Sequence, residues 1–291
     1  MESPYGTPAR APDGFAPPER WPEYAQITDP VDICAREGVG ANPAGVRWSL
    51  WPFTFEEYYG DQEPDMAAAR TGALARNRIV TWKRGQRTDA PAGWRAFSQK
   101  TWRIDGAAPL AAGEDYTARW HKNARRDLRL FAEARASGRC SVEQVNFDDY
   151  AAAYRQSLIA ARAGTFRLHD LGKKLAHPLT RDNTELLAVR DQSGALVAGS
   201  AVIYSPTHRL STHVAPFMTE GARELYAATG LVDYWFAETA RRGYRYAVTT
   251  SFWMPGKPKS WKGFSEFKSH FGYAFVEYPP ILYRFVRGAL W

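Results

Sequence analysis

Apolar and polar positions alternate with two different periods along the chain, which separates a strand-rich first part from a mixed second part. In the first part, short alternating runs with aromatic and β-branched residues predict strands over 46–51, 78–82, 93–97 and 100–104. From residue 114 the apolar residues recur every three or four positions, which predicts a helix over 114–137 that ends before Gly138. Its apolar stripe consists of Tyr116, Trp120, Ala124, Leu128 and Phe131.

After Gly138, strand and helix patterns follow one another in a defined order. The predicted strands cover 140–145, 185–189, 195–204, 209–215, 244–250, 273–276 and 281–286. The predicted helices cover 146–163, 169–177, 228–242 and 260–270. Turn signals at 191–194 and 206–207 join the three central strands into an antiparallel meander. We expect the last two strands to close the same sheet.

Composition indicates an ordinary globular protein with a basic surface. The 291 residues are 45% hydrophobic, 24% charged and 14% aromatic, which suits one large domain or two of ordinary size. Residues 1–44 are rich in proline without a period and predict an extended arm. Lys and Arg exceed Asp and Glu by 38 − 31 = 7, which favours anionic partners or simply keeps the protein in solution.

Several classes of protein are excluded by the same reading. No apolar run approaches the roughly 18 residues of a membrane span, and the longest, 195–204, predicts a buried strand. The first 20 residues lack the apolar region of a secretory signal. The two cysteines, Cys34 and Cys140, form no metal-binding or disulfide pattern, so we expect a cytoplasmic protein without a metal site.

Two basic segments are candidates for binding phosphate or RNA. The first is a ridge on the predicted helix over 114–137, spaced three, four and three residues apart: Arg119, Lys122, Arg126 and Arg129. The second interleaves lysines with tryptophans, as charge pairing and base stacking require: Trp253, Lys257, Lys259, Trp261 and Lys262. A solvated helix face and an exposed loop would show the same residues.

The run Lys262–Gly272 resembles a signature of a known family. Its residues fit the pattern Gly-x-x-x-Phe-Lys-x-x-Phe-Gly near the end of the Fem-type (FemABX) peptidyltransferases, which belong to the GNAT superfamily. The order of elements after Cys140 resembles the GNAT fold, and the basic helix before it resembles the Fem-type enzymes too. The resemblance implies an α+β, GNAT-like acyltransferase fold with two GNAT-like halves. We expect an arm over 1–44, a reduced first half over 45–138 and a GNAT domain over 139–291.

Enzymes of this family move an aminoacyl group from charged tRNA onto an amine, usually of a cell-wall precursor. The resemblance therefore implies direct attack of an amine acceptor, with aminoacyl-tRNA as co-substrate and no other cofactor. It places Lys268 at the donor carbonyl or phosphate, with Phe267 beside it. The strand ends of a GNAT site add further candidates. These are Thr250 and Ser251 as catalytic residues, and Tyr204, His213, Trp253 and Trp261 as substrate-binding residues.

The donor is the open point of this interpretation. GNAT enzymes that use coenzyme A carry a loop of the form Arg/Gln-x-x-Gly-x-Gly/Ala after the fourth strand. Here residues 216–223 hold one glycine and a glutamate, which favours aminoacyl-tRNA over acyl-CoA. An acyl-CoA-dependent N-acyltransferase remains the alternative on this fold, and a non-catalytic nucleic-acid-binding protein on a GNAT scaffold is the alternative from another class. The end of the strand before this signature, 247–251, also departs from the Fem-type pattern, so the acceptor is a cell-wall precursor or a small metabolite.

Overall fold

A computed structural model of the chain describes residues 32–35, 44–50, 53–59, 62–64, 77–84, 89–96, 104–111, 113–176, 178–206, 209–249, 252–253, 259, 262–277 and 280–287. Their contacts divide the chain into two compact units. The first unit holds Asp105–Ala274, and the second holds the described residues before Asp105 together with those after Ala274. The boundary expected at residue 138 differs from this division, because the basic helix packs within the first unit.

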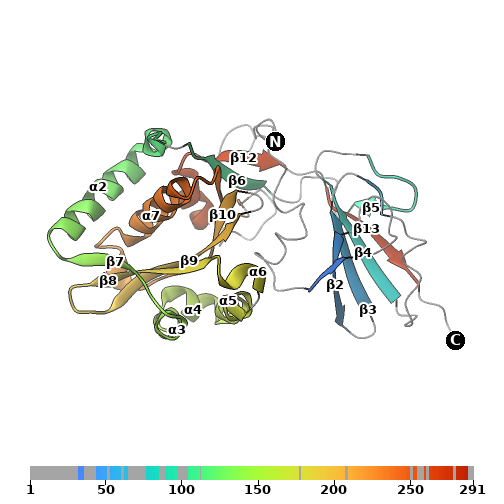
Figure 1. The fold of residues 1–291 in the computed structure, drawn as a ribbon, viewed down its shortest axis with the longest axis horizontal. Helices are drawn as coiled ribbons and strands as arrows, with labels where there is room; N and C mark the ends of the chain where they lie inside the picture. Colours follow the sequence, from blue (N-terminus) through green and yellow to red (C-terminus); the bar gives the residue numbers. More distant parts are fainter. Residues whose placement is uncertain are drawn as a thin grey trace. The chain divides into compact units, whose positions relative to one another are not determined.

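The first unit is built on a seven-stranded mixed sheet (Figure 1). Its order is β12-β6-β11-β10-β9-β8-β7, and among the pairs whose register is described only β10 with β11 is parallel. The strands are β6 (Ile104–Pro109), β7 (Cys140–Gln144), β8 (Thr184–Asp191), β9 (Leu196–Ser205), β10 (Leu210–Met218), β11 (Tyr246–Thr249) and β12 (Ala274–Glu277). The predicted meander of β8, β9 and β10 is confirmed, and β9 is buried along nearly its whole length.

Helices cover both faces of this sheet (Figure 1). On one side lie α2 (Lys122–Ala136) and α7 (Ala227–Arg241). On the other lie α3 (Phe147–Arg155), α4 (Leu158–Ala163) and α5 (Phe166–Ala176), followed by the short α6 (Pro178–Arg181). The last helix, α8 (Lys262–Ser269), carries the Fem-like signature. Two short 3-10 turns, η3 (Tyr116–Arg119) and η4 (Glu220–Ala222), precede α2 and α7.

The single helix predicted over 114–137 is interrupted at Trp120. Trp120 has extended backbone (ψ 147°) and is 2% exposed, so η3 ends there and α2 starts at Lys122. His121 caps α2 through its Nδ1 atom, which accepts a hydrogen bond from the Asn123 N–H. Burial of the large indole therefore accompanies the break, and Arg119 lies in η3, whereas the rest of the basic ridge lies on α2. In the same way Ser157 starts a new helix within the predicted 146–163, whereas the predicted cap at Asn146 is confirmed.

The core under α3 and α5 is aromatic and aliphatic. Tyr150 and Tyr154 of α3 meet Phe217 of β10 edge-on, with ring centroids 5.0 and 6.1 Å apart. Leu168 and Leu171 of α5 complete this buried cluster. It fixes the first turns of α5 against β10, which is the strand that passes through the candidate site described below.

The second unit contains a six-stranded sheet of order β1-β2-β3-β4-β13-β5. Its strands are β1 (Asp32–Ala35), β2 (Ala44–Leu50), β3 (Phe53–Tyr59), β4 (Asn77–Lys83), β5 (Arg95–Ala96) and β13 (Leu282–Val286). β1 lies in the segment expected to be an extended arm, and β3 was not predicted. β13 pairs with β4 and β5 rather than closing the sheet of the first unit, so that expectation was wrong.

The core of the second unit surrounds a tryptophan pair. Trp82 and Trp94 lie with ring centroids 5.4 Å apart, beside the buried Tyr58 and Leu282. Among the residues that the structure describes in both units, no helix is at once long and apolar enough to cross a membrane.

Candidate active site

The candidate site lies where the two parallel strands of the first unit separate. β10 and β11 pair from Leu210–Tyr246 to Thr212–Val248. β11 then ends at Thr249, while β10 continues to Met218. Ends of parallel strands leave backbone groups free to meet a ligand, and this is the place where a GNAT-like sheet was expected to open.

A β-bulge marks this point on β10. The pairing with β9 shifts between Val214 and Phe217, so that Ala215 and Pro216 together face a single residue of β9. Ala215 has a φ of +46°, and its carbonyl accepts a hydrogen bond of 2.7 Å from the Tyr150 hydroxyl. Pro216 is compatible with this position because a bulge does not need its N–H. The buried tyrosine thus holds the bulge in place.

His213 lies two residues before the bulged Ala215 and faces β11. Its Nε2 atom lies 3.3 Å from the Thr249 hydroxyl, and its ring centroid lies 4.8 Å from that of Trp235 in α7. Burial, with the positive charges of Lys268 and Arg167, lowers the pKa of His213 to about 3. The imidazole is therefore neutral at physiological pH and suited to hydrogen bonding, because a general base works best with a pKa near the operating pH.

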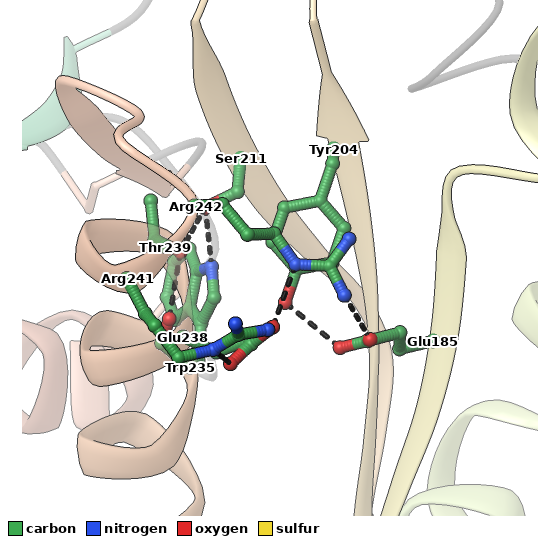
Figure 2. A network of polar contacts seen from close by, with 8 residues as sticks. All are labelled: Glu185, Tyr204, Ser211, Trp235, Glu238, Thr239, Arg241 and Arg242. Carbon is green, nitrogen blue, oxygen red and sulfur yellow. Dashed lines mark hydrogen bonds and ion pairs between the residues drawn. The ribbon is translucent and has the colours of Figure 1, made fainter.

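Trp235 is fixed by a buried chain of hydrogen bonds, shown in Figure 2. Its indole N–H donates to the Ser211 hydroxyl at 2.7 Å. The Ser211 and Thr239 hydroxyls are 2.7 Å apart, and the Thr239 hydroxyl donates to the Trp235 carbonyl at 2.7 Å. A satisfied buried network of this kind holds a side chain rigidly, so the wall behind His213 is preorganised.

Lys268 approaches the same place from α8. Its Nζ atom lies 5.8 Å from the centre of the Phe252 ring, and its charge contributes to lowering the pKa of His213. Phe252 in turn packs closely over β6, where a Cβ on Gly106 would come within 2.8 Å of the Phe252 ring. His213 and the signature lysine are therefore close enough to interact electrostatically, which makes them candidates for one site.

Arg167 is a further candidate for this site, and the sequence did not point to it. It lies in the first turn of α5, and its positive charge acts on both His213 and Tyr154. No ion pair or hydrogen bond joins it to another side chain in the described parts of the chain. Phe166 beside it is 76% exposed. A Phe-Arg dipeptide at the start of a helix carries no sequence signal by itself, and Arg167 becomes a candidate only because α5 packs on β10.

Comparison with solved structures places this geometry among known proteins. FemX superposes with a TM-score of 0.68 at 11% identity, over 92% of this chain and 91% of that chain. A C-terminal domain from Agrobacterium fabrum, described as that of a lysylphosphatidylglycerol synthetase, gives a TM-score of 0.58 at 13% identity, over 92% and 91%. L-PGS from Bacillus licheniformis gives 0.56 at 12% identity, over 92% of each chain. The chain has a Fem-type, GNAT-like fold. No protein-family model and no curated protein sequence matches it.

The Fem-like signature has a structural explanation on this fold. Phe271 is 2% exposed and packs edge-on against Trp120, with ring centroids 4.9 Å apart. Phe267, expected to bind substrate, lies 4.8 Å from Phe271. Gly272 has a φ of +67°, and a Cβ there would come within 3.1 Å of the Arg119 carbonyl. The two phenylalanines and the glycine therefore dock α8, which leaves Lys268 as the signature residue that faces the site.

The aromatic-basic segment is described only in part. Lys262 places its Nζ atom 5.6 Å from the centre of the Trp253 ring, and the Trp253 N–H donates to the buried Ser265 hydroxyl at 2.6 Å. Lys259 is exposed. The other candidates from this part of the chain lie outside the described residues: Thr250, Ser251, Lys257 and Trp261. Within the described ranges, no three His, Cys, Asp or Glu side chains gather closely enough to hold a metal ion.

Tyr204, expected to bind substrate, is part of the polar network in Figure 2. It is 1% exposed, its hydroxyl donates to Glu185 at 2.9 Å, and the Arg242 guanidinium lies 4.0 Å from its ring centre. Burial, followed by the Glu185 charge, raises the pKa of Tyr204. Because Glu238 pairs with Arg242 as well, these contacts fasten the end of α7 to the sheet rather than presenting Tyr204 to a ligand.

The basic ridge is mostly neutralised by neighbouring carboxylates. Arg119 pairs with Glu114 at 3.2 Å, and its guanidinium also donates to the Pro109 carbonyl. The other two arginines pair along α2, Arg126 with Asp127 at 2.8 Å and Arg129 with Glu133 at 3.7 Å. Lys122 is exposed and has no carboxylate partner among the residues described. Lys122 is therefore the member of the ridge most available to a phosphate.

We expect Lys122→Ala to reduce the salt dependence of RNA binding. Losing one phosphate contact should lower the slope of log K against log salt by about 0.7 to 0.9. The measurement is a salt titration of tRNA binding by fluorescence anisotropy, with Lys173→Ala as control, because Lys173 is an exposed lysine on α5 outside the ridge. Equal slopes for wild type and Lys122→Ala would mean that the ridge is only a solvated helix face.

Proposed function

We propose that the protein is an aminoacyltransferase that moves an aminoacyl group from charged tRNA to an amine acceptor, a cell-wall precursor or a small metabolite. The observation that carries this proposal is the Fem-type fold together with the position of Lys268. The lysine of the Fem-like signature acts electrostatically on His213, which lies on β10 near the point where β10 and β11 separate, and a GNAT-like fold receives its acyl donor at such a point. The names of the similar structures, FemX and lysylphosphatidylglycerol synthetase, suit such a reaction.

The reaction is an aminolysis of an ester. The neutral amine attacks the aminoacyl carbonyl, a C–N bond forms, and the C–O bond to the tRNA ribose breaks. The proton lost by the amine ends on the ribose oxygen that leaves. Negative charge develops on the carbonyl oxygen in between, and the Lys268 ammonium is the group we assign to stabilise it. No covalent enzyme intermediate is involved.

The side chains around Lys268 have separate roles in this proposal. His213 stays neutral and supplies a hydrogen bond to the aminoacyl group, since its low pKa keeps it uncharged. Arg167 adds a second positive charge on the side of α5, which suits an anionic group of the acceptor or donor. The adjacent Phe166, which is largely exposed, offers a surface for stacking.

The segment after β10 favours tRNA over coenzyme A as the donor. Coenzyme A on this fold needs free backbone N–H groups in that segment to bind its pyrophosphate. Here several of these N–H groups donate to carbonyls of the protein: Thr219 to Val197 at 2.8 Å, Ala222 to Thr219 at 3.3 Å, Arg223 to Glu220 at 3.3 Å, and Tyr226 to Arg223 at 3.1 Å. The carboxylate of Glu220 would also repel a phosphate. An acyl-CoA-dependent N-acyltransferase is therefore the second choice.

Mass spectrometry of the acceptor tests the proposal. The protein is incubated with a mixture of charged tRNAs and a panel of amine acceptors, which includes peptidoglycan precursors and amino-containing metabolites. We expect one acceptor to gain the mass of an aminoacyl residue. Uncharged tRNA with free amino acids is the control and should give no product. Transfer from acetyl-CoA without any transfer from charged tRNA would replace the proposal with its alternative.

A further inference from the structure

A pair of stacked histidines joins α8 to the start of α2. The rings of His121 and His270 are 4.7 Å apart at an angle of 21°. The His121 N–H also donates to the His270 carbonyl at 2.8 Å, directly after the last turn of α8. With the Phe271–Trp120 contact and Gly272 against Arg119, these contacts form what we call the α8 clamp, residues 119–121 with 270–272.

We propose that His121 and His270 are positioning residues, which hold α8 and its Lys268 in place while both rings are neutral and release the helix when they become protonated. The effect of this release on catalysis rests on the proposed function of Lys268. The α8 clamp itself does not rest on that function, because its contacts join residues of the protein to one another. Lys268 lies only two residues before His270, so a shift of the end of α8 moves the lysine directly.

Protonation weakens the clamp in three ways. The Nδ1 atom of His121 caps α2 by accepting the Asn123 N–H at 3.3 Å, and a doubly protonated ring has no acceptor left. A positive charge at the N-terminus of α2 opposes the helix dipole. Two stacked imidazolium rings at 4.7 Å also repel each other. The neutral pair has none of these costs.

The surroundings of His270 also favour its neutral ring in the docked state. Burial, followed by the charge of His121, lowers the pKa of His270 below 6.5. Glu266 on α8 and Asp127 on α2 act in the opposite direction and are outweighed. A histidine with a lowered pKa in the docked state takes up its proton more readily in the released state. The docked state is therefore fully stable above about pH 6.5 and loses stability as the pH falls through that value.

Two variants separate this role from simple packing. His270→Phe keeps an aromatic ring for stacking and the backbone carbonyl that accepts from His121, but it cannot be protonated. His121→Asn keeps a good helix cap and removes the imidazole ring. His169→Phe is the matched control, because His169 is an exposed histidine of α5 outside the clamp.

Hydrogen exchange by mass spectrometry, without substrate, tests the clamp. We expect protection of the amides in 262–272, corrected for intrinsic rates, to fall about threefold or more between about pH 7.5 and about pH 5.5. The fall should persist in full in His169→Phe and become clearly smaller in His270→Phe and in His121→Asn, because each of these two variants removes one of the two stacked imidazole rings and the repulsion between them. Unchanged protection in the wild type, or the same fall in His270→Phe, would overturn the proposal.

A second measurement keeps the test valid if a variant fails to fold. Titration of the wild-type His270 ring by NMR should give a midpoint below 6.5, and a midpoint at or above 6.5 contradicts the proposal.

In turnover assays, kcat of the wild type should fall more steeply with decreasing pH than kcat of His270→Phe. Failure of the aminoacyl-transfer assay leaves the exchange and NMR results unaffected, so the two proposals can fail separately.

Discussion

Lys268→Ala is expected to lower the turnover of the transfer reaction by about 10²–10³, the scale of removing one group that stabilises an oxyanion. The reason is the charge of the ammonium group, which helps to lower the pKa of His213, a residue of β10 near the point where β10 and β11 separate. The fold should survive, because alanine is the best helix former and Lys268 lies in the last turn of α8. The measurement is single-turnover kinetics with charged tRNA, beside a thermal melt.

Two comparisons make this result specific. Lys173→Ala removes a lysine of equal charge from the last turn of another helix and should leave turnover near that of the wild type. Lys268→Arg keeps the charge with a different shape and should recover only part of the lost rate. A folded Lys268→Ala variant with wild-type turnover would remove this lysine from the reaction.

The sequence predicted the central part of the fold well because local signals agree with packing there. The meander β8–β9–β10 has turn residues between apolar runs, and α7 ends at Arg241, shortly before Gly243, which has a φ of +72°. The interruption at Trp120 was not predictable from the period, since Trp120 continues the apolar stripe of the expected helix. The helix is interrupted where the Trp120 indole is deeply buried, which is an effect of tertiary packing.

Pairing between distant strands was the harder part. β6, with the sequence Ile-Asp-Gly-Ala-Ala-Pro, has no strand-like alternation, but it inserts beside β11 in the sheet of the first unit. β13 has a clear strand pattern, but the residues of β4 and β5 that pair with it lie between 282 − 96 = 186 and 286 − 78 = 208 positions earlier along the chain. A pattern shows that a segment is a strand, and only long-range packing decides which sheet it joins.

In the candidate site, too, the sequence pointed to residues that carry a local signal and missed features that depend on long-range packing. Lys268 and His213 were predicted from the signature and from the expected strand ends, and their role in the reaction stays a prediction; the charge of Lys268 helps to lower the pKa of His213. Tyr204 was chosen for its strand position, but its face of the sheet is covered by the end of α7. The bulge at Ala215 and the role of Arg167 depend on backbone geometry and on the docking of α5, for which the sequence carries no local sign.

The second large effect concerns the donor, and we expect ribonuclease treatment to abolish transfer completely without rescue by acetyl-CoA. An aminoacyl ester on tRNA is lost as a substrate when the RNA that the enzyme recognises is digested. Coenzyme A should bind poorly, because the N–H groups of Thr219, Ala222 and Arg223 are already donated to protein carbonyls. Forming a pyrophosphate cradle would require these turns to open and would bring phosphate close to the exposed Glu220.

Calorimetry with coenzyme A gives the most direct check of this expectation. At the concentrations at which charged tRNA supports transfer, coenzyme A should release no measurable heat of binding. Glu220→Gln is an informative variant, since removing the carboxylate lowers the repulsion but leaves the backbone hydrogen bonds of the turn unchanged, so we expect coenzyme A to bind no better. Micromolar binding by the wild-type protein would show that the turns open for the coenzyme, and the protein would then be an acyl-CoA-dependent enzyme on a Fem-type fold.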